Sequence, residues 1–136
     1  DDMSRRADMY PFIRQLQFMN VVVVGNVHLR RLDFLKYNHF IEVSTPNLHL
    51  EPGGIDRAVA SVKSYGQPAV YLVSAGVSAA VIIDRLHDAV PRSWFIDCGS
   101  IWDAFVGIGG QRQWRAELYA NPEEWTRWKE KNLTGR

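Results

Sequence analysis

The chain has 136 residues, of which 46% are hydrophobic and 23% charged, so it can bury a core and falls outside the classes of disordered and fibrous proteins. Sixteen Lys and Arg residues nearly balance fifteen Asp and Glu residues, and the net charge of +1 offers no broad field for nucleic acid or an anionic membrane. The single cysteine, Cys98, excludes an internal disulfide and a thiolate metal cage.

The N-terminal quarter predicts a helix followed by a strand. Asp8 is placed to cap the helix, and Pro11 falls in the first turn, where proline is tolerated. The apolar face of this helix would consist of Met9, Phe12, Ile13 and Leu16. Val21–Val24 is an uninterrupted β-branched run, which indicates a strand covered on both faces.

A second helix and a second strand follow. Asn26 can cap the helix, whose apolar side has leucines at a spacing of three: Leu29, Leu32 and Leu35. The strand covers Phe40–Val43 and closes before Pro46, because a residue that precedes proline avoids the helical region. The loop to Glu51 is longer than the others, and long loops often carry a ligand contact, for which His49 is the candidate.

The middle of the chain predicts a third helix, a third strand and a fourth helix. The third helix starts at Pro52–Gly54 and ends at Gly66. The third strand is Ala69–Val73, and it runs directly into the turn Ser74–Gly76. The fourth helix would turn one set of residues inward: Val77, Ala80, Val81 and Leu86.

The last third begins with a fourth strand. The apolar run Trp94–Asp97 stops at an acid and is followed by Gly99 and Ser100, which indicates a buried strand that delivers polar groups to the edge of a sheet. A glycine-rich turn then leads to a helix over residues 112–119. The last helix has the clearest start signal, with Asn121 as the cap, Pro122 in the first position and then Glu123 and Glu124.

Four strands that alternate with helices predict parallel pairing with right-handed crossovers. We expect a Rossmann-like three-layer α/β domain with a four-stranded parallel sheet and a C-terminal helix, and we take 2-1-3-4 as the order of the strands. The carboxyl ends of parallel strands meet at one edge of the sheet, where open α/β sheets bind their ligands. Small residues there let a ligand approach the backbone, and the helix starts at 26 and 76 direct amide groups toward it. The residues expected at this edge are Gly25, Asn26, Ser44, Thr45, Ser74, Ala75, Gly76, Asp97, Gly99 and Ser100.

Two carboxylates and one arginine are the candidates for chemistry, each with a structural alternative. Asp97 and Asp103 can bind a metal or a ribose hydroxyl or act as a base, whereas Asp97 can also cap the segment that follows it. Arg112 can bind a phosphate or be a solvated arginine at the head of its helix. The turn Ser74–Gly76 can face a ligand or simply permit a tight turn. No base is spaced to activate Cys98, and the histidines lack metal-ligand spacing.

We expect one domain over residues 1–136 of a soluble, cytoplasmic protein. No apolar run reaches the roughly 18–20 residues of a membrane span, and Met3–Arg6 is not followed by the apolar core of a signal peptide. A first residue other than methionine is typical of a processed product or of a part of a longer protein.

Several segments resemble the C-terminal half of GT-D-type glycosyltransferases. The resemblance covers roughly residues 10–120 and is most specific over residues 96–107. The similar segments are Ser74-Ala75-Gly76, Asp84-Arg85-Leu86, Phe95-Ile96-Asp97-Cys98-Gly99-Ser100-Ile101-Trp102-Asp103, Val106-Gly107 and Gln111-Arg112. In that family a V-G-P type turn ends the first strand of this half and a D-I-G-S/H type turn follows the last. Val24-Gly25-Asn26 and Asp97-Cys98-Gly99-Ser100 occupy those places here.

The resemblance implies that a sugar is transferred from a nucleotide-sugar donor to an acceptor, with a divalent metal (Mn or Mg). It makes Asp97 and Asp103 the catalytic candidates, with Asp103 the first candidate base. The ligand-binding candidates are Gly25, Asn26, Ser74, Ala75, Gly76, Gly99, Ser100 and Arg112.

Family members also carry an N-terminal acidic D-x-E type motif, embedded in a segment like R-F-G-D-G-E, which this sequence lacks. The chain is therefore expected to be the C-terminal part of a longer enzyme, or a subunit completed by another chain. The alternative is a non-catalytic Rossmann-like binding or assembly module, in which exposed tryptophans form a protein interface: Trp114, Trp125 and Trp128.

Overall fold

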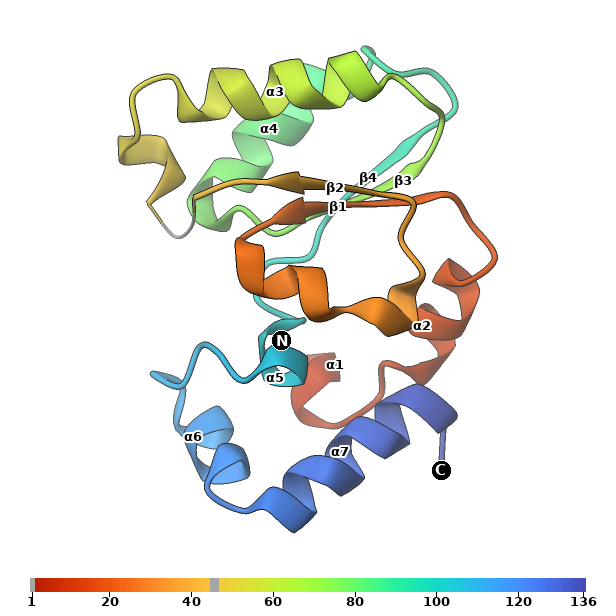
Figure 1. Ribbon diagram of the computed structural model, residues 1–136, viewed down its shortest axis with the longest axis vertical. Coiled ribbons are helices and arrows are strands. Elements are labelled where there is room, and N and C mark those ends of the chain that lie inside the picture. Colours follow the sequence, from red (N-terminus) through yellow and green to blue (C-terminus); the bar gives the residue numbers. More distant parts are fainter. Residues whose placement is uncertain (1, 45–46) are drawn as a thin grey trace.

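The computed structural model describes residues 2–44 and 47–136; Thr45, predicted at the sheet edge, and Pro46 lie outside the described residues. One all-parallel sheet has the order β2-β1-β3-β4 (Figure 1). The strands are β1 (Val21–Gly25), β2 (His39–Glu42), β3 (Val70–Val73) and β4 (Trp94–Asp97). The predicted Rossmann-like α/β domain and its strand order are confirmed.

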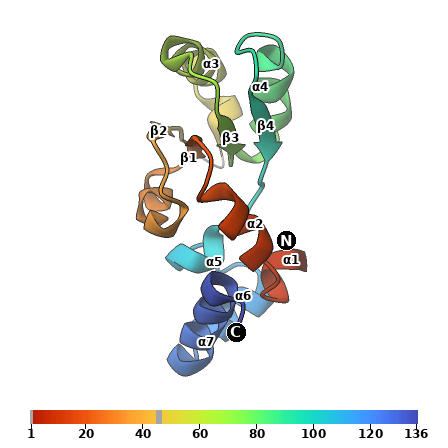
Figure 2. The ribbon, with the colours of Figure 1, turned by 90° about the vertical axis from the view of Figure 1, so that its right-hand side faces the viewer.

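Helices cover both faces of the sheet (Figures 1 and 2). One face packs against α3 (Gly54–Tyr65) and α4 (Ala79–Leu86). The other face packs against α2 (Tyr10–Leu16), the 3₁₀ segments η1 (Val27–Arg31) and η2 (Asp33–Leu35), and α5 (Asp103–Val106). Beyond α5 lie α6 (Gln113–Tyr119), α7 (Pro122–Thr134) and the short α1 (Asp2–Arg5). Two further 3₁₀ turns are η3 (Leu48–Leu50) and η4 (Gly76–Ser78).

The central strand β1 divides its valines between the two sides of the core. Val22 and Val24 pack on the side of α3 and α4, whereas Val21 and Val23 pack on the opposite side. All four are completely buried, so the predicted coverage of both faces is confirmed. The outer strand β4 differs from the prediction of a buried strand, because it is an edge strand and Trp94 is 72% exposed.

The start of α2 also differs from the prediction. Met9, and not Asp8, is the residue that precedes the helix, and its side chain makes no capping hydrogen bond. The backbone N–H of Met9 instead donates to Oδ1 of Asn132, 2.9 Å away in α7. A distant side chain thus replaces the local cap that the sequence suggested. The buried face of this segment is as predicted for Met9, Ile13 and Leu16.

The predicted helix after Asn26 consists of two 3₁₀ segments, η1 and η2. Its three leucines, Leu29, Leu32 and Leu35, are completely buried. A spacing of three matches the three residues per turn of a 3₁₀ helix, so one buried row continues through both segments. Oδ1 of Asn26 accepts the N–H of His28 at 3.0 Å, which confirms the predicted cap.

The inward face predicted for the fourth helix is wrong except at Leu86. Val77, Ala80 and Val81 are exposed, and the helix buries Ala79 and Ile82 in their place. The reason is a 3₁₀ turn over Gly76–Ser78, which delays the α-helix and shifts the phase of its buried face.

The last helix begins as predicted, since Oδ1 of Asn121 accepts the N–H of Glu124. Trp128 is buried and its Nε1 donates to the carbonyl oxygen of Ser4 at 2.9 Å. Trp114 and Trp125 are half-buried. The expectation that the three tryptophans are exposed is therefore wrong. Within residues 2–44 and 47–136, the structure has no helix whose length and apolarity would allow it to cross a membrane.

Candidate functional site

An open groove of about 840 Å³ lies at the carboxyl edge of the sheet. The parallel register fixes this edge, because Gly25 pairs with Glu42 and Val73 pairs with Asp97. Turns that follow all four strands contribute to the lining. The predicted site residues that line it are Asn26, Ser44, Ser74, Gly76, Asp97, Gly99, Ser100 and Asp103.

The other predicted residues lie beside the groove. Ala75 is buried in the core below it. A Cβ added at Gly25 would lie 2.6 Å from Cδ1 of Leu29, so glycine here allows η1 to pack closely on the end of β1. Arg112 lines a neighbouring pocket of about 570 Å³, and His49 is exposed on η3 and does not line the groove.

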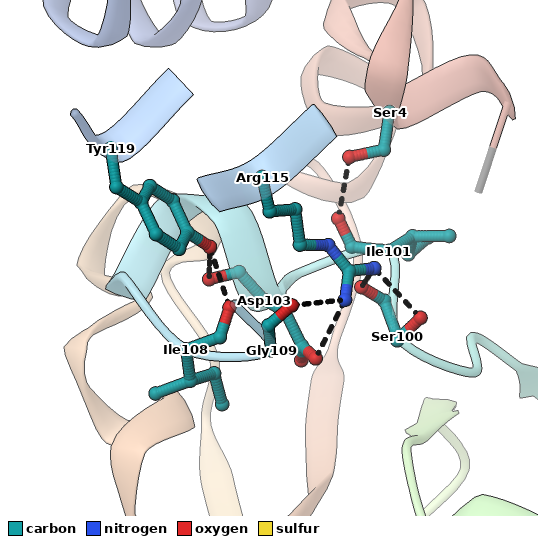
Figure 3. Close-up of polar contacts among 8 residues, drawn as sticks. All are labelled: Ser4, Ser100, Ile101, Asp103, Ile108, Gly109, Arg115 and Tyr119. Atoms are coloured by element: carbon teal, nitrogen blue, oxygen red, sulfur yellow. Dashed lines mark hydrogen bonds and ion pairs between the residues drawn. The ribbon is translucent and has the colours of Figure 1, made fainter. Parts of the chain in front are cut away.

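A buried arginine that the sequence reasoning missed holds the rim next to Asp103 (Figure 3). Arg115 on α6 is only 1% exposed. Its Nη2 donates to the carbonyl oxygen and to Oγ of Ser100, at 3.0 and 2.8 Å. Its Nη1 lies 3.4 Å from both Oδ2 of Asp103 and the carbonyl oxygen of Gly109. One side chain therefore fixes both ends of the loop that borders the groove.

Two further features tighten this loop. Gly109 has φ +70°, and a Cβ there would press on Nη1 of Arg115 and lie 2.7 Å from Oδ2 of Asp103. The hydroxyl of Tyr119 contacts the carbonyl oxygens of Ile108 and Asp103, at 2.5 and 3.2 Å. Burial raises the pKa of Tyr119 to about 12, so it remains a hydrogen-bond donor at any physiological pH.

The carboxyl group of Asp103 is the more unusual of the two predicted carboxylates. Burial raises its pKa above the ordinary value, and the nearby charges of Arg115 and Arg112 oppose this shift. A carboxylate whose pKa moves toward neutral is better suited to accept a proton than an ordinary aspartate. Asp103 also lines the groove, so geometry and electrostatics agree on it as a candidate base.

Asp97 has the capping role that its sequence position allowed, and it is also accessible from the groove. Its Oδ1 accepts the N–H of Gly99 at 3.0 Å, so it caps the turn after β4. It is also exposed and lines the groove, so it can contact a ligand at the same time. The turn after β3 offers a second polar group: Ser74 is 7% exposed, and its buried hydroxyl has no hydrogen-bond partner among the described residues.

Half of the lining was not predicted, and three of these residues matter for what can bind. Glu42 stands at the end of β2, next to Gly25 in the sheet. Glu42 could have been predicted as a lining residue, because it ends a strand whose neighbour in the sheet ends in a glycine. Val27 and Val77 are exposed and line the groove as well. Nothing in the sequence separates such valines from those of the core.

The donor set for a divalent metal is weak. Within residues 2–44 and 47–136, no group of three or more His, Cys, Asp and Glu side chains is placed to hold an ion. Asp103 is already paired with Arg115, and Asp97 with the backbone of its own turn. Asp97 and Asp103 by themselves therefore do not make up a metal-binding group.

The thiol of Cys98 lies next to the groove but is buried. Burial raises the pKa of Cys98 to about 12. We expect the native protein to react with a disulfide reagent at pH 8 about a thousandfold more slowly than the protein in urea, because far less thiolate forms than at the ordinary pKa of 9.0. The release of thionitrobenzoate measures both rates, and similar rates would contradict the burial of this thiol.

The chain was compared with known protein families, proteins and structures. No protein-family model, curated protein or solved structure matches the chain with significant similarity. The groove and the resemblance of individual segments to GT-D-type glycosyltransferases are therefore the two indications of function.

Proposed function

We propose that the groove binds the nucleoside diphosphate part of a nucleotide-sugar and that the chain is the donor-binding part of a glycosyltransferase. The observation that carries this proposal is the groove at the carboxyl edge of the sheet, to which the turns after all four strands contribute polar or small residues. Crevices of this kind bind nucleotides in many open α/β sheets. The sugar-transfer chemistry itself comes from the resemblance over residues 96–107.

In this proposal Asp103 acts on the acceptor. Its carboxylate takes the proton from an acceptor hydroxyl as that oxygen attacks the anomeric carbon of the donor sugar. The bond between the anomeric carbon and the phosphate oxygen breaks, and the nucleoside diphosphate leaves with the electron pair. Arg115 keeps the Asp103 carboxylate in place at the groove wall. Asp97 contacts the donor, Ser74 forms part of the groove wall, and Gly76 and Gly99 let the donor approach the backbone.

The charge of the groove sets a condition on binding. Its ionisable lining consists of Glu42, Asp97, Asp103 and His28, so a diphosphate meets more negative than positive charge. Arg112, the predicted phosphate ligand, lines the neighbouring pocket, and its positive charge lowers the pKa of Asp103. The divalent metal implied by the resemblance stays a prediction, and it would have to arrive bound to the nucleotide.

Titration calorimetry tests the proposal with uridine, guanosine, adenosine and cytidine diphosphates, each with and without Mn²⁺. We expect saturation by at least one of them between micromolar and millimolar concentration. Replacing Asp97 with Asn should raise its Kd about tenfold or more, because a hydrogen bond to a charged group contributes about 1.5–3 kcal/mol. The asparagine retains an Oδ1 that can cap Gly99, so the turn is preserved.

Asp84→Asn is the matched control, because Asp84 is an exposed aspartate on α4 that does not line the groove. Its Kd should equal that of the unmodified protein. If no nucleoside diphosphate binds, or if Asp97→Asn binds as well as the control, the proposal is wrong. Burial of Trp128 takes one of the three tryptophans away from the alternative, a tryptophan-lined assembly surface, while Trp114 and Trp125 stay partly exposed.

A further inference from the structure

Glu42 has a defined place in the groove. It is the last residue of β2, and the parallel register sets it directly beside Gly25, the last residue of β1. The N–H of the next residue, Val43, donates to the carbonyl oxygen of Gly25 at 2.9 Å, which ties the two strand ends together. The side chain of Glu42 lines the groove and is 53% exposed, so a ligand can reach its carboxylate.

The carboxylate of Glu42 is oriented by its neighbours. Nε of Arg30 lies 3.5 Å from its Oε1. The guanidinium group of Arg30 lies over the ring of Phe40, 4.4 Å from the ring centroid. The hydroxyl of Tyr37 donates to the carbonyl oxygen of Arg30 at 2.9 Å. Arg30, which stacks on Phe40, therefore contacts one side of the Glu42 carboxylate, and the other side of that carboxylate faces the groove.

The chemistry of this carboxylate selects hydroxyl groups. An ionised carboxylate only accepts hydrogen bonds, and its two oxygens can receive the two hydroxyls of a vicinal diol. It repels a phosphate group. In dinucleotide-binding Rossmann domains an acidic residue about 20 residues after the glycine turn of the first strand binds the ribose hydroxyl of the cofactor. Glu42 and Gly25 reproduce that relationship in adjacent strands β2 and β1.

The surroundings give the ligand a direction. The exposed Val27 and Val77 line the groove after β1 and β3, where they offer apolar contact to the flat face of a base. Gln111 lines both the groove and the neighbouring pocket, which contains Arg5 and Arg112. Negative charge is thus better accommodated toward Gln111 than toward Glu42.

We infer that Glu42 binds the ribose hydroxyls of the nucleotide and makes the groove selective for ribonucleotides over 2′-deoxyribonucleotides. This inference deepens the proposed function and rests on it, since it names the part of the donor that one residue recognises. The phosphates then point toward Gln111 and the arginine-lined pocket.

The test uses the ribonucleoside diphosphate that binds most tightly in calorimetry, together with its 2′-deoxy counterpart. We expect the unmodified protein to bind the ribonucleotide about tenfold or more tightly than the deoxynucleotide. Glu42→Gln should weaken ribonucleotide binding by a similar factor and leave deoxynucleotide binding nearly unchanged, so that the preference is lost. Glu51→Gln is the matched control, because Glu51 also pairs with an arginine, Arg57 at 2.8 Å, but lies outside the groove.

The outcomes separate this inference from the proposed function. If a nucleoside diphosphate binds but the protein does not distinguish ribose from deoxyribose, the inference is wrong and the proposed function stands. The inference is also wrong if Glu42→Gln weakens both ligands equally. If no nucleoside diphosphate binds, the proposed function fails and the inference fails with it. Thermal unfolding of Glu42→Gln, followed by circular dichroism, shows whether the variant is folded.

Discussion

Replacing Arg115 with methionine is expected to lower the free energy of unfolding by about 3–5 kcal/mol, the cost of removing one partner of a buried ion pair. Methionine fills a similar volume but offers no donors. Asp103 then keeps a partly buried charge without its partner, and Ser100 and Gly109 lose the donors that Nη1 and Nη2 provide (Figure 3). Urea denaturation followed by circular dichroism measures the change.

Two comparisons make this prediction specific. Arg127→Met removes an exposed arginine from α7 and should change the free energy of unfolding by no more than about 0.5 kcal/mol. The double variant Arg115→Met with Asp103→Asn should recover part of the loss, because the carboxylate that needed a partner is gone. A loss for Arg115→Met no larger than that for Arg127→Met would contradict the role of this cluster.

The pH dependence of the same variants gives an independent check. Burial raises the folded-state pKa of Asp103 above 3.8, so the folded protein holds this proton more tightly than the unfolded chain. The contribution of Asp103 to stability therefore decreases as pH rises from 3.8 through its folded pKa. Without Arg115 the pKa rises further, and the decrease should extend toward neutral pH in Arg115→Met and disappear in the double variant.

Replacing Trp102 with alanine should also lower the free energy of unfolding by about 3–5 kcal/mol. Trp102 is completely enclosed between α2, η2 and α5, with ring centroids of Phe12, Phe34 and Phe105 at 5.9, 6.4 and 6.0 Å. Removal of the indole leaves a cavity, which could close only if α2, η2 and α5 all moved inward. Urea denaturation gives the change in free energy.

The chain offers its own control for this substitution. Trp94→Ala removes the same side chain from an exposed position on β4 and should cost no more than about 0.5 kcal/mol. Trp102→Phe should cost much less than Trp102→Ala, because it keeps an aromatic ring in place and removes an N–H that has no oxygen acceptor among the described residues. Equal costs for Trp102→Ala and Trp94→Ala would show that the aromatic cluster does not stabilise the fold.

The sequence predicted those features that depend on local chemistry. Four consecutive valines specify β1 because such a run suits a strand covered on both faces, and Asn26 and Asn121 cap their segments as their side chains allow. Parallel pairing followed from the alternation of strands with helices, whereas the order 2-1-3-4, which the structure confirms, was one choice among the orders that this alternation allows. The placement of the groove followed in turn, because parallel strands end at a common edge.

Features that depend on distant partners could not be predicted. Arg115 lies in a helix whose sequence is compatible with an exposed arginine, and only the loop that carries Ser100 and Asp103 makes its burial favourable. The backbone N–H of Met9, at the start of α2, donates to the side chain of Asn132, more than a hundred residues away, and no local side chain caps this helix. Val77 is exposed because a 3₁₀ turn precedes α4, and the spacing of apolar residues does not predict that turn.

The bonds that join the first and last helices have a consequence for biosynthesis. Ser4 accepts a hydrogen bond from Trp128 and donates one to Ile101 (Figure 3), and Met9 donates to Asn132. A nascent chain can assemble the sheet once residue 97 has emerged from the ribosome, but the layer formed by α1 and α7 has to wait for residue 132. Until α7 has been synthesised, Ser4 lacks its hydrogen bond from Trp128, so the support that Ser4 gives to Ile101 in the groove loop is complete only when both ends of the chain are present.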